Sequence, residues 1–453
     1  MALRPPVTLI AMPLPVTTLL NARWMVPIEP EGLVLEHHTL VMRQGRIIAL
    51  LPQAQAAQQF SAATVVQLDR HVLLPGLVNA HTHASMSLLR GLADDLPLTA
   101  WLQEHIWPTE ARWVDPEFVR DGTQLAIAEM LRGGVTCFND MYFYPEVSAA
   151  VARECGMRAC VGLIVLDFPT AYARSPDAYL EQGLALHAAL RDAPLLHTAL
   201  APHAPYTVSA PTLERIGQLA EELAIPVHIH LHETAAEVAQ FLAQHGCRPL
   251  QRLEQLGLLS PRLLAVHMTQ LEPTEIERLA SAGAHIAHCP ESNLKLASGF
   301  CPTARLDAVG VNLSLGTDGA ASNNDLDLFS ELRTAALLGK GVAADPSVLP
   351  AARVLRMATL NGACALGLGD EIGSLQPGKS ADVIAVDLGQ PETEPVYHPI
   401  SQLVYAASRQ QVSDVWIAGQ HLLADRRLTT LELTTIVQRA RSWRERIFAG
   451  RLA

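Results

Sequence analysis

The fold is decided by the segment Leu73-Leu74-Pro75-Gly76-Leu77-Val78-Asn79-Ala80-His81-Thr82-His83. It is a short apolar stretch, punctuated by Pro75-Gly76, that ends in two histidines one residue apart. In an extended strand, side chains at positions i and i+2 lie on the same face, so His81 and His83 are expected to point the same way off the strand end. Two neutral imidazoles presented together suit a divalent metal of the zinc class. The alternative is that the two histidines bind no metal, and residues elsewhere in the chain are needed to distinguish the two interpretations.

Short apolar segments alternate with longer amphipathic ones after residue 73. The predicted strands are residues 74–80, 134–140, 158–165, 196–202, 226–232, 263–267, 284–289 and 311–317. The helical patterns between them include residues 116–132, 210–224, 235–245 and 272–282. Eight strand–helix units in this order predict an α/β fold, a (β/α)8 barrel of the TIM type.

Both ends of the chain have a different pattern, with short β-rich pieces separated by turn residues. This pattern predicts that the two ends together form a small β-sandwich. We therefore expect residues 1–72 to form the N-terminal part of the sandwich and residues 73–368 the catalytic barrel. Residues 369–453 would complete the sandwich and end in an amphipathic helix from about Leu431.

Composition narrows the classes of partner. The chain has 453 residues, 49% of them hydrophobic and 17% charged, so it can bury a large core. Its net charge is −12 and it has no basic run, which argues against a nucleic-acid-binding surface. We therefore expect a small-molecule partner and no nucleic acid.

Compartment is indicated by the cysteines and by the N-terminal stretch. Seven cysteines are scattered along the chain with no Cys-x-x-Cys pair, which fits a reduced, cytoplasmic protein. The apolar stretch of residues 9–28 is interrupted by three prolines and carries Asn21 and Arg23. A membrane span or signal peptide is therefore not expected.

Polar residues gather where the predicted strands end. These residues are His81 and His83 after the first strand, His203 after the fourth, His230 to Glu233 at the fifth, His267 at the sixth, His288 at the seventh and Asp318 after the eighth. Active sites of such barrels lie at the carboxyl ends of the strands. The pattern therefore predicts a functional site at this rim.

The fifth strand carries three histidines on one face, His228, His230 and His232. At about 3.3 Å per residue they span more than one metal coordination shell, so they cannot all be equal ligands. The spacing alone leaves the choice between His230 and His232 open. Three inward histidines are costly unless each has a role or a partner.

A carboxylate at the eighth strand completes a possible metal site. Asp318 lies between Gly316 and Gly319, and a lone aspartate there could also cap the following turn. A metal bound by three histidines and one aspartate keeps room for a water, whose pKa the cation would lower. Glu233 is placed to shuttle protons if burial raises its pKa; otherwise it is an ordinary residue at a helix N-terminus.

At these residues the chain resembles the amidohydrolase superfamily, and within it the 5′-methylthioadenosine/S-adenosylhomocysteine deaminases. The resemblance rests on Pro75-Gly76-Leu77-Val78-Asn79-Ala80-His81-Thr82-His83, His230-Leu231-His232-Glu233, His267, Ser292-Asn293-Leu294-Lys295 and Gly316-Thr317-Asp318-Gly319-Ala320-Ala321-Ser322-Asn323. It covers nearly the whole chain, including the split sandwich. It implies a metal-dependent hydrolase that commonly self-associates into homo-oligomers.

The resemblance also implies one metal ion, usually zinc, although the same ligands accept iron or manganese. Its ligands would be His81, His83, His230 and Asp318. The resemblance favours His230 on the fifth strand because Glu233 follows it by three residues.

The implied reaction is hydrolytic deamination at C6 of an adenine nucleoside, such as 5′-methylthioadenosine to 5′-methylthioinosine with loss of ammonia. Glu233 would protonate a purine ring nitrogen, His267 would orient the attacking hydroxide, and Asp318 would take a proton from the water. Glu110 matches a carboxylate that binds the ribose hydroxyls, and His203 matches a substrate-contacting histidine.

One departure from the family pattern bears on specificity. Relatives that accept S-adenosylhomocysteine have arginines after the third strand, whereas residues 160–167 here contain none and only Arg174 is nearby. A carboxylate tail would lose a charge-assisted partner, while a methylthio group would fit an apolar lining. We therefore expect 5′-methylthioadenosine to be preferred, with S-adenosylhomocysteine and adenosine as poorer substrates.

Two other functions are compatible with this fold. One is an aminohydrolase or dechlorinase of the same superfamily acting on guanine, a pterin or an s-triazine, but Glu110 and His203 argue for a nucleoside. The other is a non-catalytic barrel scaffold, which would be expected to lose several ligands. This chain keeps all four and both Glu233 and His267.

Overall fold

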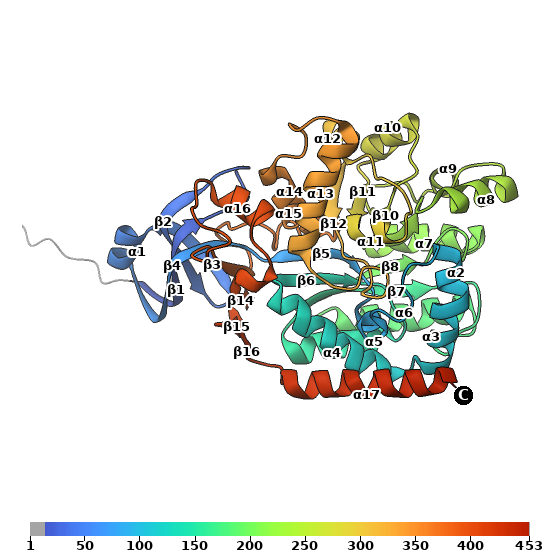
Figure 1. Cartoon of the computed structure of the whole chain (residues 1–453), viewed down its shortest axis with the longest axis horizontal. Helices are drawn as coiled ribbons and strands as arrows, with labels where there is room; N and C mark the ends of the chain where they lie inside the picture. The colour runs from blue at the N-terminus through green and yellow to red at the C-terminus, as the bar shows by residue number, and fades with distance from the viewer. Residues whose placement is uncertain (1–13, 453) are drawn as a thin grey trace, which may run out of the picture.

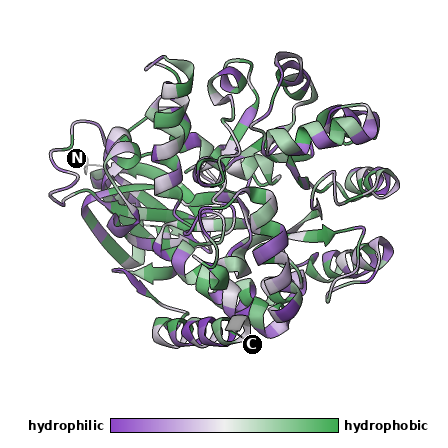
Figure 2. Cartoon of the chain, turned by 45° about the vertical axis from the view of Figure 1, so that its right-hand side comes forward, coloured by the Kyte–Doolittle hydropathy of each residue, from purple (hydrophilic) through white to green (hydrophobic). Residues whose placement is uncertain are grey.

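The structure, a computed structural model, describes residues 14–452 and consists of two eight-stranded sheets (Figure 1). Residues 1–13 and 453, which the predicted domain division includes, lie outside the described residues. Hydrophobic residues concentrate in the central strands and hydrophilic residues on the outer helices (Figure 2). Among the described residues, no helix is both long and apolar enough to cross a bilayer.

One sheet is the predicted barrel. Its strands, in spatial and chain order, are β5 (Leu77–Thr82), β6 (Val135–Asp140), β7 (Arg158–Val165), β8 (Leu196–Pro202), β9 (Val227–Leu231), β10 (Leu263–His267), β11 (His285–His288) and β12 (Asn312–Leu315). Every neighbouring pair is parallel. Beyond the ladder, the Asp318 N–H donates to the His81 carbonyl at 3.0 Å and links the last strand region to the first. The predicted (β/α)8 fold is confirmed.

Helices follow the barrel strands. They are η1 (Ala84–Leu89), α2 (Leu98–Ala100), η2 (Trp101–Ile106), α3 (Trp107–Trp113), α4 (Pro116–Arg132), α5 (Pro145–Cys155), α6 (Pro176–Leu190), α7 (Ala210–Leu223), α8 (Ala235–His245), α9 (Pro249–Gln255), α10 (Pro273–Ala282), α11 (Pro290–Lys295), α12 (Thr303–Ala308), α13 (Leu328–Ala343), α14 (Ala351–Met357) and α15 (Leu360–Ala365). Their starts follow local capping chemistry. Asp115 accepts from the Phe118 N–H at 2.8 Å, and Thr234 and Glu237 form a capping box.

The other sheet is built from both chain ends. Its order is β16 (Arg427–Leu428), β15 (Gln420–Ala424), β14 (Val412–Ile417), β13 (Val383–Asp387), β4 (Phe60–Pro75), β1 (Leu14–Met25), β2 (Leu35–Arg43) and β3 (Arg46–Pro52). The β1–β4 pair is parallel and the other pairs are antiparallel. The halves join where β13 pairs with β4. The remaining helices are α1 (Gln53–Gln59), α16 (Pro399–Tyr405), η3 (Arg409–Gln411) and α17 (Leu433–Leu452).

The chain passes from one sheet to the other at Pro75-Gly76. The predicted first strand, residues 74–80, is therefore divided, because residues 74–75 end β4 and β5 begins at Leu77. A Cβ at Gly76 would lie 1.9 Å from Thr136 Oγ1, so this crossing requires glycine. It lies close to the predicted domain boundary at residues 72/73, which, like the boundary at 368/369, stays a prediction.

The C-terminal helix α17 packs along α4 on the outside of the barrel (Figure 1). Trp443 is buried, donates its indole N–H to Asp121 Oδ2 at 2.9 Å, and meets the Phe118 ring edge-to-face at 5.2 Å. The indole of Trp443 therefore has a polar and an aromatic partner on α4.

A buried ion pair joins the two sheets. Arg158, at the start of β7, donates from Nε to Asp382 Oδ2 at 2.7 Å and from Nη2 to Asp382 Oδ1 at 3.1 Å. Both side chains are 1% exposed. Removing one partner of a buried pair leaves the other charge without compensation.

We expect Arg158→Met to lower the free energy of unfolding by about 3–5 kcal/mol, because Asp382 would remain buried and unpaired. Urea unfolding followed by circular dichroism measures this change. Arg120→Met is the control, since Arg120 pairs with Glu154 at the surface and such pairs contribute less than about 1 kcal/mol. Equal losses in the two variants would contradict the role assigned to the buried pair.

Candidate active site

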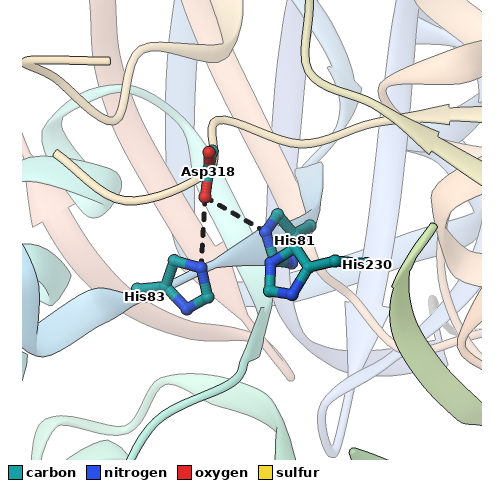
Figure 3. Close-up of side chains that lie close together, drawn as sticks. All are labelled: His81, His83, His230 and Asp318. Carbon is teal, nitrogen blue, oxygen red and sulfur yellow. Dashed lines mark hydrogen bonds and ion pairs between the residues drawn. The ribbon is translucent and has the colours of Figure 1, made fainter. Parts of the chain in front are cut away.

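Three histidines and an aspartate meet at the carboxyl end of the barrel strands (Figure 3). His81 lies on β5, His83 follows it, His230 lies on β9 and Asp318 follows β12. One possible ligand atom from each lies within 4.8 Å of all the others. The Nε2 atoms of His81 and His83 are 3.1 and 3.2 Å from Asp318 Oδ1. Residues up to 237 positions apart are thus brought to one point.

The Nδ1 atoms of two of the three clustered histidines face oxygen acceptors. His83 Nδ1 is 2.6 Å from the Met141 carbonyl, and His230 Nδ1 is 2.8 Å from the His203 carbonyl. An imidazole that donates from Nδ1 keeps its lone pair on Nε2. Three imidazole nitrogens and one carboxylate are a donor set that suits a zinc-class cation, so the residues present fit such an ion.

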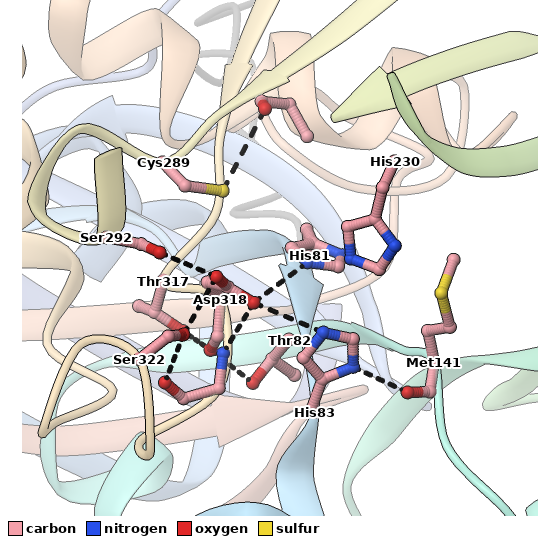
Figure 4. A network of polar contacts seen from close by, with 12 residues as sticks. His81, Thr82, His83, Met141, His230, Cys289, Ser292, Thr317, Asp318 and Ser322 are labelled. Carbon is pink, nitrogen blue, oxygen red and sulfur yellow. Dashed lines mark hydrogen bonds and ion pairs between the residues drawn. The ribbon is translucent and has the colours of Figure 1, made fainter. Parts of the chain in front are cut away.

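Asp318 is held by several donors (Figure 4). Its Oδ2 accepts from the hydroxyls of Ser292 at 2.6 Å and Ser322 at 2.8 Å, and its Oδ1 accepts from the Gly319 N–H at 2.8 Å. Burial by itself would raise the pKa of Asp318, but the hydrogen bonds and charges of His81 and His83 lower it well below its ordinary value. The carboxylate is therefore ionised and fixed in orientation.

Two further titratable groups lie beside this cluster. Glu233 is 6% exposed, and its Oε2 is 3.9 Å from His267 Nε2. Burial raises the pKa of Glu233, and the Asp318 charge adds to this effect while His267 opposes it. His267 Nδ1 is 2.9 Å from Asn293 Oδ1, which orients the ring. A buried acid and an oriented imidazole are thus available for proton transfer.

Three of the four clustered residues, His83, His230 and Asp318, line a cavity of about 480 Å³, while His81 is fully buried. The polar floor of this cavity consists of His83, His203, His230, Glu233, His267 and Asp318. Its walls are mainly apolar and aromatic, and they include Leu98, Trp101, Leu102, Ile106, Trp107, Val114, Tyr144, Ile164, Leu166, Phe168, Tyr172 and Tyr206. Among the described residues that line the cavity, none is a lysine or arginine. The cavity suits an uncharged, partly aromatic ligand.

Glu110 reaches the cavity from α3. The Tyr142 hydroxyl donates to Glu110 Oε1 at 2.7 Å, and both residues line the cavity. Burial raises the pKa of Glu110 to about 7, although the bond from Tyr142 and the nearby His83 oppose the rise. Glu110 therefore presents a carboxylate with one oxygen already engaged.

The structure places the other predicted residues as follows. His203 lines the cavity, with its Nδ1 3.0 Å from Thr207 Oγ1, and burial lowers its pKa to about 3. Arg174 is exposed and is not among the lining residues. His232 lies outside the cluster: its Nδ1 is 3.1 Å from the Gln270 carbonyl and its Nε2 accepts from the Leu250 N–H at 3.1 Å.

Several residues of the site had no role in the sequence prediction. Ser292, Asn293 and Ser322 belong to the quoted motifs, so their positions were visible although their partners were not. Tyr142 follows the second barrel strand by two residues, and its place at the rim was the available signal. Its partner Glu110 lies 32 positions away, and no pattern in the sequence links the two.

Comparisons with known proteins agree with this geometry. The chain is 50% identical to a 5-methylthioadenosine/S-adenosylhomocysteine deaminase of Teredinibacter turnerae over 95% of this chain and 98% of the relative. A relative of the same name from Saccharophagus degradans is also 50% identical, over 96% and 98%.

Solved structures share the fold. An adenosine deaminase from Xanthomonas campestris with bound zinc superposes with a TM-score of 0.96 at 56% identity, covering 96% of this chain and 100% of that one. A zinc complex of an atrazine chlorohydrolase from Arthrobacter aurescens has a TM-score of 0.85 at 24% identity, covering 94% and 100%, and this likeness shows the fold alone. The model of the Amidohydrolase family matches residues 72–422. The barrel with its histidine–aspartate cluster, the relatives and this match together establish that the chain belongs to the amidohydrolase family.

Proposed function

We propose that this protein is a metal-dependent hydrolase that converts 5′-methylthioadenosine to 5′-methylthioinosine and ammonia. The observation that carries the proposal is the cluster of His81, His83, His230 and Asp318 beside a mainly apolar cavity, which is lined by three of them, His83, His230 and Asp318, and by Glu233 and Glu110. The names of the relatives support the same reaction class.

The four clustered residues would hold one divalent cation, which we propose is zinc, while Fe²⁺ and Mn²⁺ suit the same ligands. When bound, such a cation acts as a Lewis acid and makes water a nucleophile at neutral pH. Asp318 is ionised and anchored by two serine hydroxyls, so it would also accept a proton from the attacking water.

Glu233 and His267 would act on different atoms: Glu233 on a purine ring nitrogen, and His267 on the attacking oxygen. The raised pKa of Glu233 suits the transfer of a proton to a purine ring nitrogen, which must be protonated before the amino group can leave. His267, oriented by Asn293, would orient the attacking oxygen and stabilise the negative charge that it carries. Both side chains line the cavity beside the cluster.

The nucleoside sugar would be bound by Glu110. Its carboxylate, with Oε1 held by Tyr142, would accept hydrogen bonds from the ribose hydroxyls, and His203, which follows β8 at the same rim, would also contact the substrate. These contacts favour a nucleoside over a free base or a triazine ring. The retained ligands, Glu233 and His267 favour catalysis over a scaffold role.

The cavity wall supports discrimination at the 5′ substituent. Ile164, Leu166, Phe168 and Tyr172 line it, and the described lining contains no lysine or arginine. A homocysteine carboxylate would lose its hydration without gaining an ion-pair partner, whereas a methylthio group would gain by leaving water. S-adenosylhomocysteine and adenosine would therefore be poorer substrates.

We further propose that the protein acts in the cytoplasm and forms homo-oligomers. All seven cysteines are free, which suits a reducing compartment. Exposed apolar side chains on α13, Leu337 at 55% and Val342 at 47%, support self-association through a barrel helix.

The first prediction concerns the metal. The purified enzyme is expected to contain about one zinc per chain, and His230→Ala is expected to lose it and to release ammonia from 5′-methylthioadenosine more than about 100-fold more slowly. Metal analysis measures the zinc content, and the absorbance change on deamination measures the reaction rate. His232→Ala is the control, because His232 bonds to Gln270 and Leu250 instead of facing the cluster. Full activity of an enzyme that contains no divalent metal would exclude the proposal.

The second prediction concerns substrate choice. We expect kcat/KM for 5′-methylthioadenosine to exceed that for S-adenosylhomocysteine by at least about tenfold, because the wall offers the carboxylate no partner. Phe168→Arg, at the partly exposed edge of the cavity, should narrow the ratio, whereas Arg174→Ala should leave it unchanged. Guanine and an s-triazine, assayed for ammonia release in parallel, should be poor substrates. Equal kcat/KM values for the two substrates would disprove the proposal that the apolar wall selects against the homocysteine carboxylate.

The third prediction concerns pH. Because the pKa of Glu110 is raised to about 7, the ionised carboxylate that binds ribose is lost as the pH falls through 7. KM for 5′-methylthioadenosine should therefore decrease as the pH rises from about 6 to about 8. Glu110→Gln should raise KM about 10- to 100-fold, since hydrogen bonds to charged groups contribute about 1.5–3 kcal/mol. It should also remove this pH dependence, and an unchanged profile in Glu110→Gln would assign the titration to another group.

A further inference from the structure

His228 is a buried histidine beside the metal cluster that the proposed reaction does not use. It lies on β9, two residues before His230, and is 0% exposed. Its Nε2 is 2.8 Å from His81 Nδ1, and the two rings meet edge-to-face with centroids 4.9 Å apart. His228 thus contacts His81 at Nδ1, the ring nitrogen that does not face Asp318.

The acceptor for His81 differs in kind from the acceptors of the other two ligand histidines. The Nδ1 atoms of His83 and His230 face the main-chain carbonyls of Met141 and His203, which the backbone holds in place. His81 Nδ1 faces only a side chain, that of His228, among the hydrogen bonds of the described residues. The orientation of the His81 ring therefore depends on the side chain of His228, which a substitution can remove.

A ligand imidazole that presents Nε2 to a cation carries its proton on Nδ1, and that buried N–H needs an acceptor. His228 Nε2 is the acceptor within reach. We propose that His228 is a positioning residue of the metal centre, which holds the His81 ring with its Nε2 towards the cation. This inference rests on the metal site of the proposed function.

His228 is itself held from the neighbouring side of the barrel. Asn139 Nδ2, on β6, lies 3.1 Å from His228 Nδ1 and also donates to the Ala80 carbonyl at 2.9 Å. Strands β5, β6 and β9 are thus linked beneath the ligands.

The test compares His228→Gln with His228→Met, two side chains of similar length of which only glutamine offers an oxygen acceptor. Zinc affinity is measured by competition with a chromophoric chelator on the folded full chain. His228→Met should weaken zinc binding about 10- to 100-fold, and His228→Gln should remain within about threefold of the wild type. The visible absorption of the cobalt-substituted protein should shift in His228→Met and not in His228→Gln.

The matched control is His232→Met, at the residue directly after β9 and equally buried, whose partners are Gln270 and Leu250. It should leave zinc affinity within about threefold of the wild type, whatever it does to stability. Wild-type zinc affinity in His228→Met, or equal weakening in all three variants, would overturn the proposal. If His228→Met does not fold, His228→Phe takes its place, with the same expected weakening.

Zinc binding is measured in the absence of turnover. The positioning role of His228 and the proposed deaminase function can therefore be refuted independently. An enzyme that binds zinc in a His228-dependent manner but does not deaminate 5′-methylthioadenosine would refute the proposed substrate and support the positioning role. A wild-type chain that binds no divalent metal would refute both.

Discussion

The rest of the structure depends on one constraint: Asp318 faces three imidazoles in the interior of a barrel mouth. Buried carboxylate and imidazole groups destabilise a fold unless each has a partner. Here the carboxylate receives two serine hydroxyls and the Gly319 N–H, and the imidazole Nδ1 atoms are held by carbonyls or by His228. These secondary contacts leave the Nε2 atoms of the histidines and the anion directed at one point, where a cation completes the charge balance.

The barrel makes this convergence possible. Parallel strands place all their carboxyl ends at one rim, so residues from β5, β9 and β12 meet there without any long loop having to reach across. The segment from η1 to α3 then covers the rim and brings Glu110 to the cavity wall. The walls add apolar and aromatic surface without a lysine or arginine in the described lining, which suits an uncharged nucleoside. The proposed chemistry thus lies on the floor of the cavity, and the proposed selectivity lies in its walls.

Much of the fold and site was predictable because its signals are local. Strand–helix alternation predicted the barrel, with β7, β8 and β10 at the expected residues, and Asp115 and Thr234 mark helix starts by their own side chains. The spacing of His81 and His83, and the place of Asp318 at a strand end, indicated a metal site for the same reason. The choice between His230 and His232 rested on family resemblance, because the alternating pattern puts both on the same face of the predicted strand.

The sequence by itself therefore determined the type of fold, the rim at which the chemistry lies and the classes of residue that carry it. Tertiary structure alone decided which buried groups are paired: Tyr142 with Glu110, Asn293 with His267 and His228 with His81. It also placed Arg174 outside the cavity lining and His232 in a contact between loops. Hydrogen bonds depend on distances and directions between atoms from different strands, and those arise only when the barrel closes.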